Sequence, residues 1–167
     1  MFDNQVVEVG SREVFRYKVN IKDFSKIQQL FVPDLELSKN TMIDGRLDSE
    51  KNIFRLGTRN IKRLKYGDRE FDKLKVSAKN NDDYLDIELT ADYVKLNDSV
   101  SLEQFVLITE AFDNDFGSSI RWNNKSGNYG FIATRCEVIS HNEFAFTLDT
   151  VRIQAQGHLW ETTKQAL

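Results

Sequence analysis

The chain repeats one pattern in two stretches, FDKLKVSAKNNDDYLDIELTA (71–91) and LEQFVLITEAFDNDFGSSIRW (102–122). They align without a gap at an offset of 31 residues, from Phe71 to Leu102. In each copy apolar and polar residues alternate, an acidic or amide-rich break follows, and a second alternation comes after it. Alternation with period two is typical of half-buried β-strands joined by a turn. A weaker third copy begins near Thr41, so the sequence predicts a stack of β-hairpins.

The same alternation extends over most of the chain. It is strict from Phe15 to Ile21, where apolar residues alternate with basic or amide residues. Turn-forming residues at 38–40, 48–52, 97–99, 122–128 and 140–143 separate further short apolar runs. Strands at a spacing of about 8–12 residues indicate an antiparallel all-β fold.

One segment has helical spacing instead. Phe24, Ile27, Leu30 and Phe31 recur at intervals of three and four residues, with Asp23 as the expected N-cap and Pro33 as the stop. We predict a short helix over 23–32 whose apolar stripe packs against the sheet.

Composition restricts the class of protein. Hydrophobic residues make up 40% of the 167 residues, which is enough for a folded core. Charged residues make up 29%, but the net charge is only -3, so there is no basic footprint for nucleic acid. No apolar run approaches the ~20 residues that span a bilayer, and the first residues lack the pattern of a secretory signal. We expect one domain, with 1–12 and 161–167 poorly ordered.

No residue pattern points to catalysis, a cofactor or a metal. The two histidines, His141 and His158, lack any standard zinc spacing, and Cys136 lies mid-strand as an expected inert thiol. Paired acids could suggest Ca²⁺ or, on a concave sheet face, glycoside hydrolysis, but acids at the same place in both repeats fit turn chemistry better. These acids are Asp82, Asp83, Asp113 and Asp115.

The apolar face of the sheet is the remaining candidate. It could be the dry core of a two-sheet sandwich in a binding or adhesion module, or the floor of an open groove for an apolar ligand. The residues alone favour the sandwich. The aromatic residues expected on this face are Phe54, Phe71, Phe105, Phe116, Phe131, Phe144 and Phe146.

Several segments resemble a known family. FVPDLELSKNTMIDGRL (31–47) looks like the unit of short helix, Pro-Asp and Gly-containing strand in the TamB proteins (translocation and assembly module family) of Bacteroidetes-type bacteria. The hairpin repeat, SIRWNN (119–124) and GHLW (157–160) are also similar to that family's serial hairpins. The resemblance covers about 19–160 and rests on alternation plus a few fixed residues.

This resemblance implies a curved, trough-like sheet and favours the groove over the sandwich. It implies an AsmA-like periplasmic protein anchored in the inner membrane, with an Omp85-type outer-membrane barrel as partner. The implied role is outer-membrane protein assembly or phospholipid transport between the membranes. The implied lining consists of Phe54, Leu56, Leu74, Val76, Leu85, Ile87, Leu89, Phe105, Leu107, Phe116 and Ile120.

The chain is much shorter than members of that family. The expected N-terminal membrane anchor and the C-terminal region that would meet the barrel have no counterpart in these residues. We therefore expect a β-repeat segment of a longer protein, which binds a phospholipid or another apolar ligand without catalysing a reaction.

Overall fold

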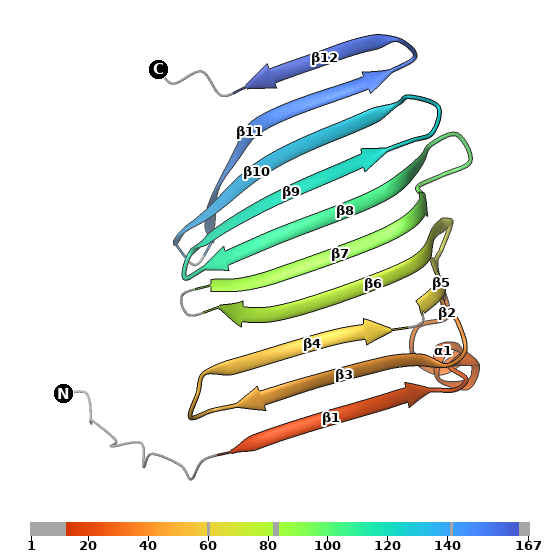
Figure 1. The fold of residues 1–167 in the computed structure, drawn as a ribbon, viewed down its shortest axis with the longest axis vertical. Coiled ribbons are helices and arrows are strands. Elements are labelled where there is room, and N and C mark those ends of the chain that lie inside the picture. The colour runs from red at the N-terminus through yellow and green to blue at the C-terminus, as the bar shows by residue number, and fades with distance from the viewer. Residues whose placement is uncertain (1–12, 60, 82–83, 141, 164–167) are drawn as a thin grey trace, which may run out of the picture.

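A computed structural model describes residues 13–59, 61–81, 84–140 and 142–163. Within these residues twelve strands form one antiparallel sheet in the order β1-β3-β4-β6-β7-β8-β9-β10-β11-β12, with β5 on β6 and β2 on β5 (Figure 1). The all-β prediction is confirmed. The elements are β1 (Val14–Ile21), α1 (Ser25–Phe31), β2 (Leu35–Leu37), β3 (Thr41–Asp48), β4 (Ile53–Arg59), β5 (Ile61–Tyr66), β6 (Arg69–Asn81), β7 (Tyr84–Lys95), β8 (Ser101–Phe112), β9 (Asp115–Asn123), β10 (Tyr129–Ser140), β11 (Glu143–Ala155) and β12 (His158–Thr163).

The sequence repeat is a repeat of hairpins. β6–β7 is the first copy and β8–β9 the second, and the weaker third copy is β3–β4. The first strand of each clear copy has the same irregularity, because Lys73 and Gln104 both have a left-handed backbone with φ 51°. These positions are 31 residues apart. The offset therefore preserves a local backbone conformation as well as the hydrophobic pattern.

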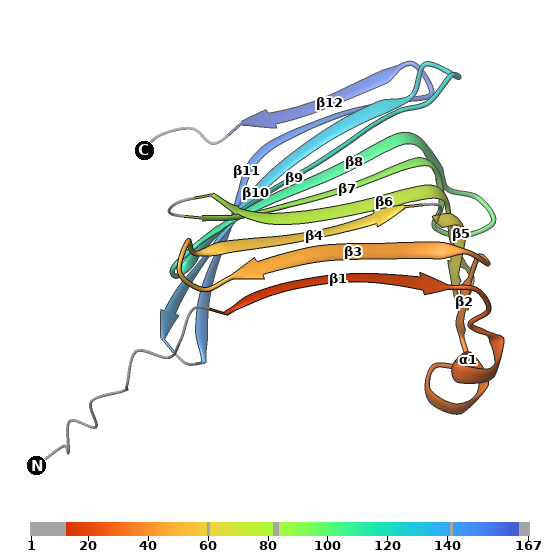
Figure 2. The same cartoon turned by 60° about the horizontal axis from the view of Figure 1, so that its bottom comes forward.

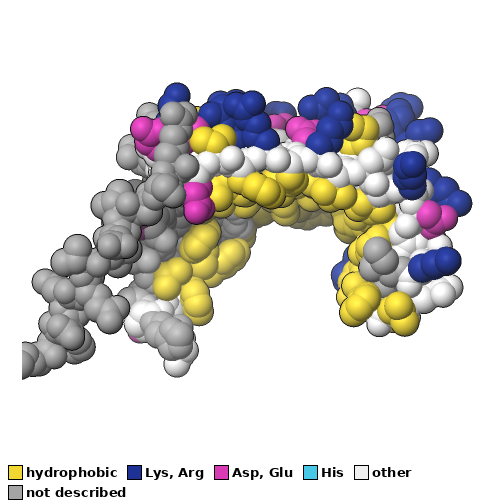
Figure 3. All heavy atoms as spheres, turned by 90° about the horizontal axis from the view of Figure 1, so that it is seen from below, with side chains coloured by type: hydrophobic (Ala, Val, Ile, Leu, Met, Phe, Trp, Pro, Cys, Tyr) yellow, Lys and Arg dark blue, Asp and Glu magenta, His cyan; other side chains and the backbone are white. Residues whose placement is uncertain are grey.

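The strands bend along their length, so the sheet forms an arch (Figure 2). Figure 2 shows the strands bending so that the ends of β10 and β11 descend on one side and β5, β2 and α1 on the other. Viewed along the stack of strands, the molecule is an arch with hydrophobic side chains on its inner surface and Lys, Arg, Asp and Glu on its outer surface (Figure 3). All strands described belong to this one sheet. The preference of the residue pattern for a two-sheet sandwich is therefore wrong for these residues.

Two aromatic side chains cover glycines on the inner surface. Tyr17 pairs with Gly45, and Trp122 with Gly130, in antiparallel register. A Cβ added to Gly45 would clash with the Tyr17 ring, and a Cβ added to Gly130 would clash with the Trp122 ring. The glycines thus let each ring lie flat against the neighbouring strand, where a larger side chain would displace it.

The best-buried cluster lies where β5 folds beside β6. Ile61, Leu74, Ala91 and Val94 are at most 6% exposed, and Val94 only 1%. Fully burying such a side chain stabilises the fold by ~1.5–3 kcal/mol. The cluster is small, so most of the apolar inner surface is not covered by a second layer of described residues.

The predicted short helix is present near 23–32, but its N-cap and its packing differ from the prediction. α1 begins at Ser25 and ends at Phe31, and its N-cap is Phe24 rather than Asp23. The Asp23 carboxylate instead accepts hydrogen bonds from the backbone N–H and the hydroxyl of Ser25. Leu30 and Phe31 are 79% and 77% exposed, so they do not pack against the sheet.

The C-terminal prediction also differs from the structure. The sequence predicts a tail from Gly157 onward, with 161–167 poorly ordered, but 158–163 form β12 against β11. The segment pairs because Trp160 faces Ile153 and Glu161 faces Arg152, which continues the alternation across Gly157. Residues 1–12 and 164–167 lie outside the described part of the chain.

Candidate functional site

The candidate site is the concave face, and strand register builds it row by row. Val76 is opposite Leu89, Leu89 opposite Leu107, and Leu107 opposite Ile120. Because directly paired residues point to the same side of a sheet, these side chains form a line across four strands. Register continues the line through Ile132 and Val151 on β10 and β11. Six apolar side chains therefore lie side by side without a polar interruption.

A parallel line lies four residues away along the strands. Phe54 pairs with Leu47 on β3, Leu85 with Ala111, and Ala111 with Phe116, while Asn80 on β6 interrupts the line between Phe54 and Leu85. All eleven residues that the resemblance implied as lining have this inward parity; Leu74 is buried, Phe116 is 38% exposed and the other nine are half-buried. Their contact with a lipid stays a prediction.

Between these lines the floor is partly polar. Leu56 and Ile87 flank Ala78, but the line then passes through Thr109, Ser118 and Thr134. The hydroxyls of Thr109 and Ser118 are 3.0 Å apart and hydrogen-bond each other. A hydroxyl that is already satisfied costs less to cover with an apolar ligand than a free one.

The concave face includes residues that the implied lining omitted. Trp122 and Trp160 have inward parity, since each belongs to the line that contains Gly130 and Ile153. On β11, Phe146 is 70% exposed on the same face. The repeat alignment ends at Trp122, so it carried no information about later strands. Gly130, which accommodates the Trp122 ring, is the sequence feature that could have indicated an inward Trp122.

One expected inward residue points the other way. Phe131 pairs with Arg121 on one side and Arg152 on the other, so it lies on the convex face. The prediction that it faces inward is wrong. The error has a simple cause: Phe131 is one residue away from Ile132, and a shift of one residue reverses the face.

The convex face is an array of paired charges. Arg59 lies 3.0 Å from Asp44, Lys79 lies 3.2 Å from Asp86, and Arg135 lies 2.9 Å from Asp115. Each pair joins neighbouring strands. Exposed pairs of this kind contribute ~0–1 kcal/mol each to the stability of the fold, so their main effect is to keep this face solvated.

Lys73 and Asp92 form a further exposed pair, at the residue of β6 that has a left-handed backbone. The Lys73 Nζ lies 2.6 Å from the Asp92 carboxylate. This hydrogen bond raises the pKa of Lys73 and lowers the pKa of Asp92. Both groups therefore stay charged at neutral pH, as in an ordinary surface ion pair.

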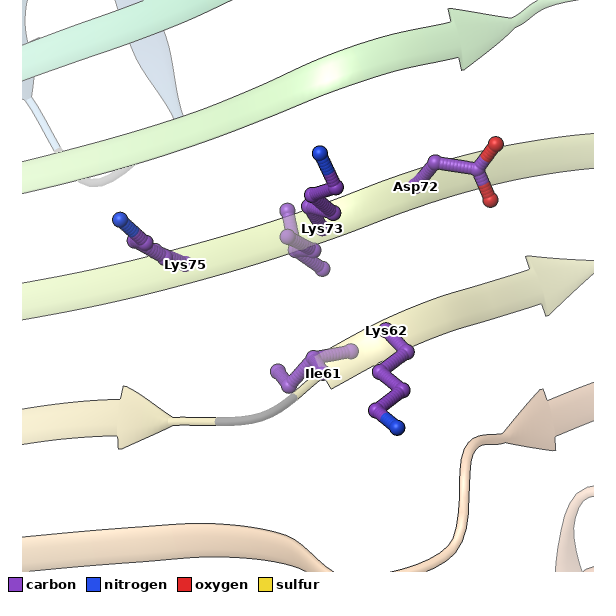
Figure 4. A pocket seen from close by; sticks show the side chains of 6 residues that line it. Ile61, Lys62, Asp72, Lys73 and Lys75 are labelled. Carbon is purple, nitrogen blue, oxygen red and sulfur yellow. The ribbon is translucent and has the colours of Figure 1, made fainter.

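A cavity of ≈ 510 Å³ lies next to this pair, where β4 leaves β6 and β5 begins. Ile61 and Leu74 form part of its lining, together with Lys62, Lys73 and Lys75. Figure 4 shows that the three lysine side chains extend in different directions. They do not converge on one point, so the cavity lacks the geometry of an anion site.

The titratable residues considered from the sequence do not assemble into a site. Asp113 occupies the β8–β9 turn with φ 22°, and Asp115 bonds Arg135, which agrees with turn and surface roles. Cys136 is half-buried and His158 starts β12. Asp82, Asp83 and His141 lie outside the described residues. Over 13–59, 61–81, 84–140 and 142–163 no group of three potential metal ligands occurs.

Comparison of the chain with known proteins found no match. No protein-family model, curated protein or solved structure matches the chain. In the part of the chain that the structure describes, no helix has the length and apolar character to cross a membrane.

Proposed function

We propose that the concave face binds the acyl chains of phospholipids, as part of a TamB-like periplasmic protein that supports outer-membrane biogenesis. The observation that carries this proposal is the apolar line from Val76 to Val151 on the inner side of a single arched sheet, over which no second layer of described residues lies. Val, Leu and Ile side chains that are partly exposed are costly in water, and an apolar ligand removes that cost.

The expected affinity follows from burial. Each buried methylene contributes ~0.8 kcal/mol, so about ten methylenes contribute on the order of 8 kcal/mol before the entropic cost of binding. Dispersion and hydrophobic contacts have no preferred direction. A chain held by them can shift along the trough without breaking a fixed set of hydrogen bonds, which suits transport better than storage.

The cellular assignment is part of the same proposal and rests on the resemblance. The full-length protein would be anchored in the inner membrane and would reach an Omp85-type barrel through regions outside these 167 residues. This segment would contribute a length of trough. Its charged convex face would stay in the aqueous periplasm.

The test uses the two tryptophans of the chain, Trp122 and Trp160, which both belong to the concave face. Phosphatidylcholine with dibrominated acyl chains quenches an indole only at close contact, whereas the unbrominated lipid does not. We expect quenching of the wild type and of both single variants, Trp122→Phe and Trp160→Phe. Equal fluorescence with the two lipids, at a concentration where native mass spectrometry detects no bound lipid, would contradict the proposal.

A further inference from the structure

A cavity beside the trough floor has a lining of a different kind. Its volume is ≈ 440 Å³, within the range of small-molecule sites. Among its apolar members, Trp122 and Ile153 belong to the concave face, and Leu102 packs against the buried cluster. The described residues that line it include no acidic or basic side chain. Its polar members carry only hydroxyls and amides: Ser99, Ser101, Asn124, Ser126, Asn128, Gln154 and Gln156.

The cavity adjoins the proposed acyl-chain floor. Trp122 is two residues from Ile120 on β9, and Ile153 is two residues from Val151 on β11. Ile120 and Val151 both belong to the apolar line of the floor. At ~3.4 Å per residue of a strand, the cavity begins about 7 Å from that line. One ligand can therefore occupy the floor and the cavity together.

The polar side chains of the cavity hold hydrogen-bond donors that the protein does not use. The indole N–H of Trp122, the Nδ2 of Asn128 and the hydroxyl of Ser126 have no partner among the described residues. The same is true of the side-chain groups of Ser99, Ser101, Gln154 and Gln156. Neutral donors suit a neutral acceptor such as an ester carbonyl oxygen. A phosphate would instead be held by charged donors such as Arg, which bind it more strongly.

We propose that this cavity receives the glycerol ester groups of a lipid whose acyl chains lie on the concave face. The inference rests on the proposed acyl-chain binding and names the class of lipid, which is a diacyl glycerol ester of any headgroup. The ester carbonyl oxygens accept hydrogen bonds from the cavity, and the headgroup stays in solvent. Because no charged side chain lines the cavity, the charge of the headgroup contributes little to binding.

Two asparagines hold the cavity in shape without a ligand. The Asn124 Nδ2 donates to the Ser101 carbonyl oxygen over 2.9 Å, and its Oδ1 accepts from the Glu103 N–H over 2.8 Å. The Asn128 Oδ1 accepts from the Gln156 N–H over 3.1 Å. These bonds join the start of β8, the β9–β10 loop and the end of β11, which lie at the same end of the strands (Figure 1). A preformed cavity lowers the ordering cost of binding.

The test compares dioctanoyl phosphatidylcholine with dioctyl phosphatidylcholine, whose ether-linked chains have the same length but no carbonyl oxygens. The readout is the recovery of tryptophan fluorescence as each lipid displaces dibrominated phosphatidylcholine. The loss of two hydrogen bonds should weaken binding of the ether lipid by about 5- to 150-fold. Equal displacement by the two lipids would overturn this inference and leave acyl-chain binding in place. If neither lipid binds, the proposed function and this inference both fail.

A variant of the cavity tests the donors. Asn128→Asp keeps the acceptor for the Gln156 N–H and removes the Nδ2 donor, so the ester-to-ether affinity ratio should fall by about two- to twelvefold. The matched control is Asn123→Asp, because Asn123 is exposed and does not line this cavity. Equal ratios in the two variants, both shown to be folded by urea unfolding, would overturn the inference.

The headgroup is tested with dioctanoyl phosphatidylglycerol, which has the same ester groups and a net negative charge. In about 0.5 M salt, which screens the surface charges of the protein, it should bind within about twofold of the phosphatidylcholine. A clear preference for the anionic lipid under these conditions would overturn the proposed indifference to the headgroup.

Discussion

A single charge on the trough floor should weaken lipid binding by more than a hundredfold. Leu107 lies in the unbroken apolar line, between Leu89 and Ile120. We expect Leu107→Asp to prevent acyl chains from resting on this line. The matched control is Ile108→Asp on the same strand, because Ile108 is also half-buried but pairs with Glu88 and Ser119 on the convex face.

The magnitude follows from two contributions. Leu107 is half-buried, so the ligand loses about 1 kcal/mol of contact when the side chain is shortened. An aspartate covered by hydrocarbon costs a further ~2.5–3.5 kcal/mol. The sum of about 3.5–4.5 kcal/mol corresponds to an increase in the dissociation constant on the order of 300- to 1,600-fold. Ile108→Asp should change it by less than about twofold.

Titration of the tryptophan fluorescence with dibrominated phosphatidylcholine gives the two dissociation constants. Urea unfolding of each variant checks that both remain folded. In the control the carboxylate introduced at position 108 is opposite Glu88, so Ile108→Asp should destabilise the fold at least as much as Leu107→Asp. A folded Leu107→Asp protein that binds with wild-type affinity would refute the reasoning. Equal loss in both variants would refute it too, since the effect would then not depend on the face.

Three further predictions test the fold. Val94→Ala should lower the free energy of unfolding by about 2 kcal/mol in urea titrations, because Val94 is 1% exposed; no loss would contradict the proposed core. Gly130→Ala should destabilise by about 1–3 kcal/mol and shift the Trp122 emission, whereas Gly117→Ala, with nothing within 4 Å, should do neither; equal effects would contradict the glycine contact. The pKa of Asp23, lowered chiefly by its hydrogen bonds to Ser25, should lie below ~3.9 in an NMR titration. The contribution of Asp23 to stability is therefore present above that pH and is lost as pH falls through the lowered pKa. An ordinary pKa would contradict those hydrogen bonds.

The sequence predicted the faces of the repeated strands well, because period two leaves little freedom. Leu85, Ile87 and Leu89 are two residues apart on β7, so one correct strand assignment places all three on the same side. The gapless repeat then transfers the assignment to β9. Even the left-handed backbone of Lys73 recurs at Gln104, although neither residue type demands it.

The sequence could not show whether that face is covered. A sandwich and a trough both require the same alternation, and the difference depends on how many strands join one sheet. The polar stretch of floor was equally hidden, since Thr109 and Ser118 alternate as regularly as leucines. The stripe of α1 was misleading for a related reason: Leu30 and Phe31 have helical spacing, but the arch carries the helix away from the sheet.

The most direct measurement of the central claim is photocrosslinking to phospholipid along β8. A photoreactive phenylalanine derivative is placed at each position of 105–110 in turn, and the yield of lipid adduct is measured by mass spectrometry. Register gives the odd positions inward parity and the even positions outward parity. We predict strong adducts at the odd positions and background at the even ones. Equal yields along the strand, or adducts at the even positions, would contradict an acyl-chain trough on the concave face.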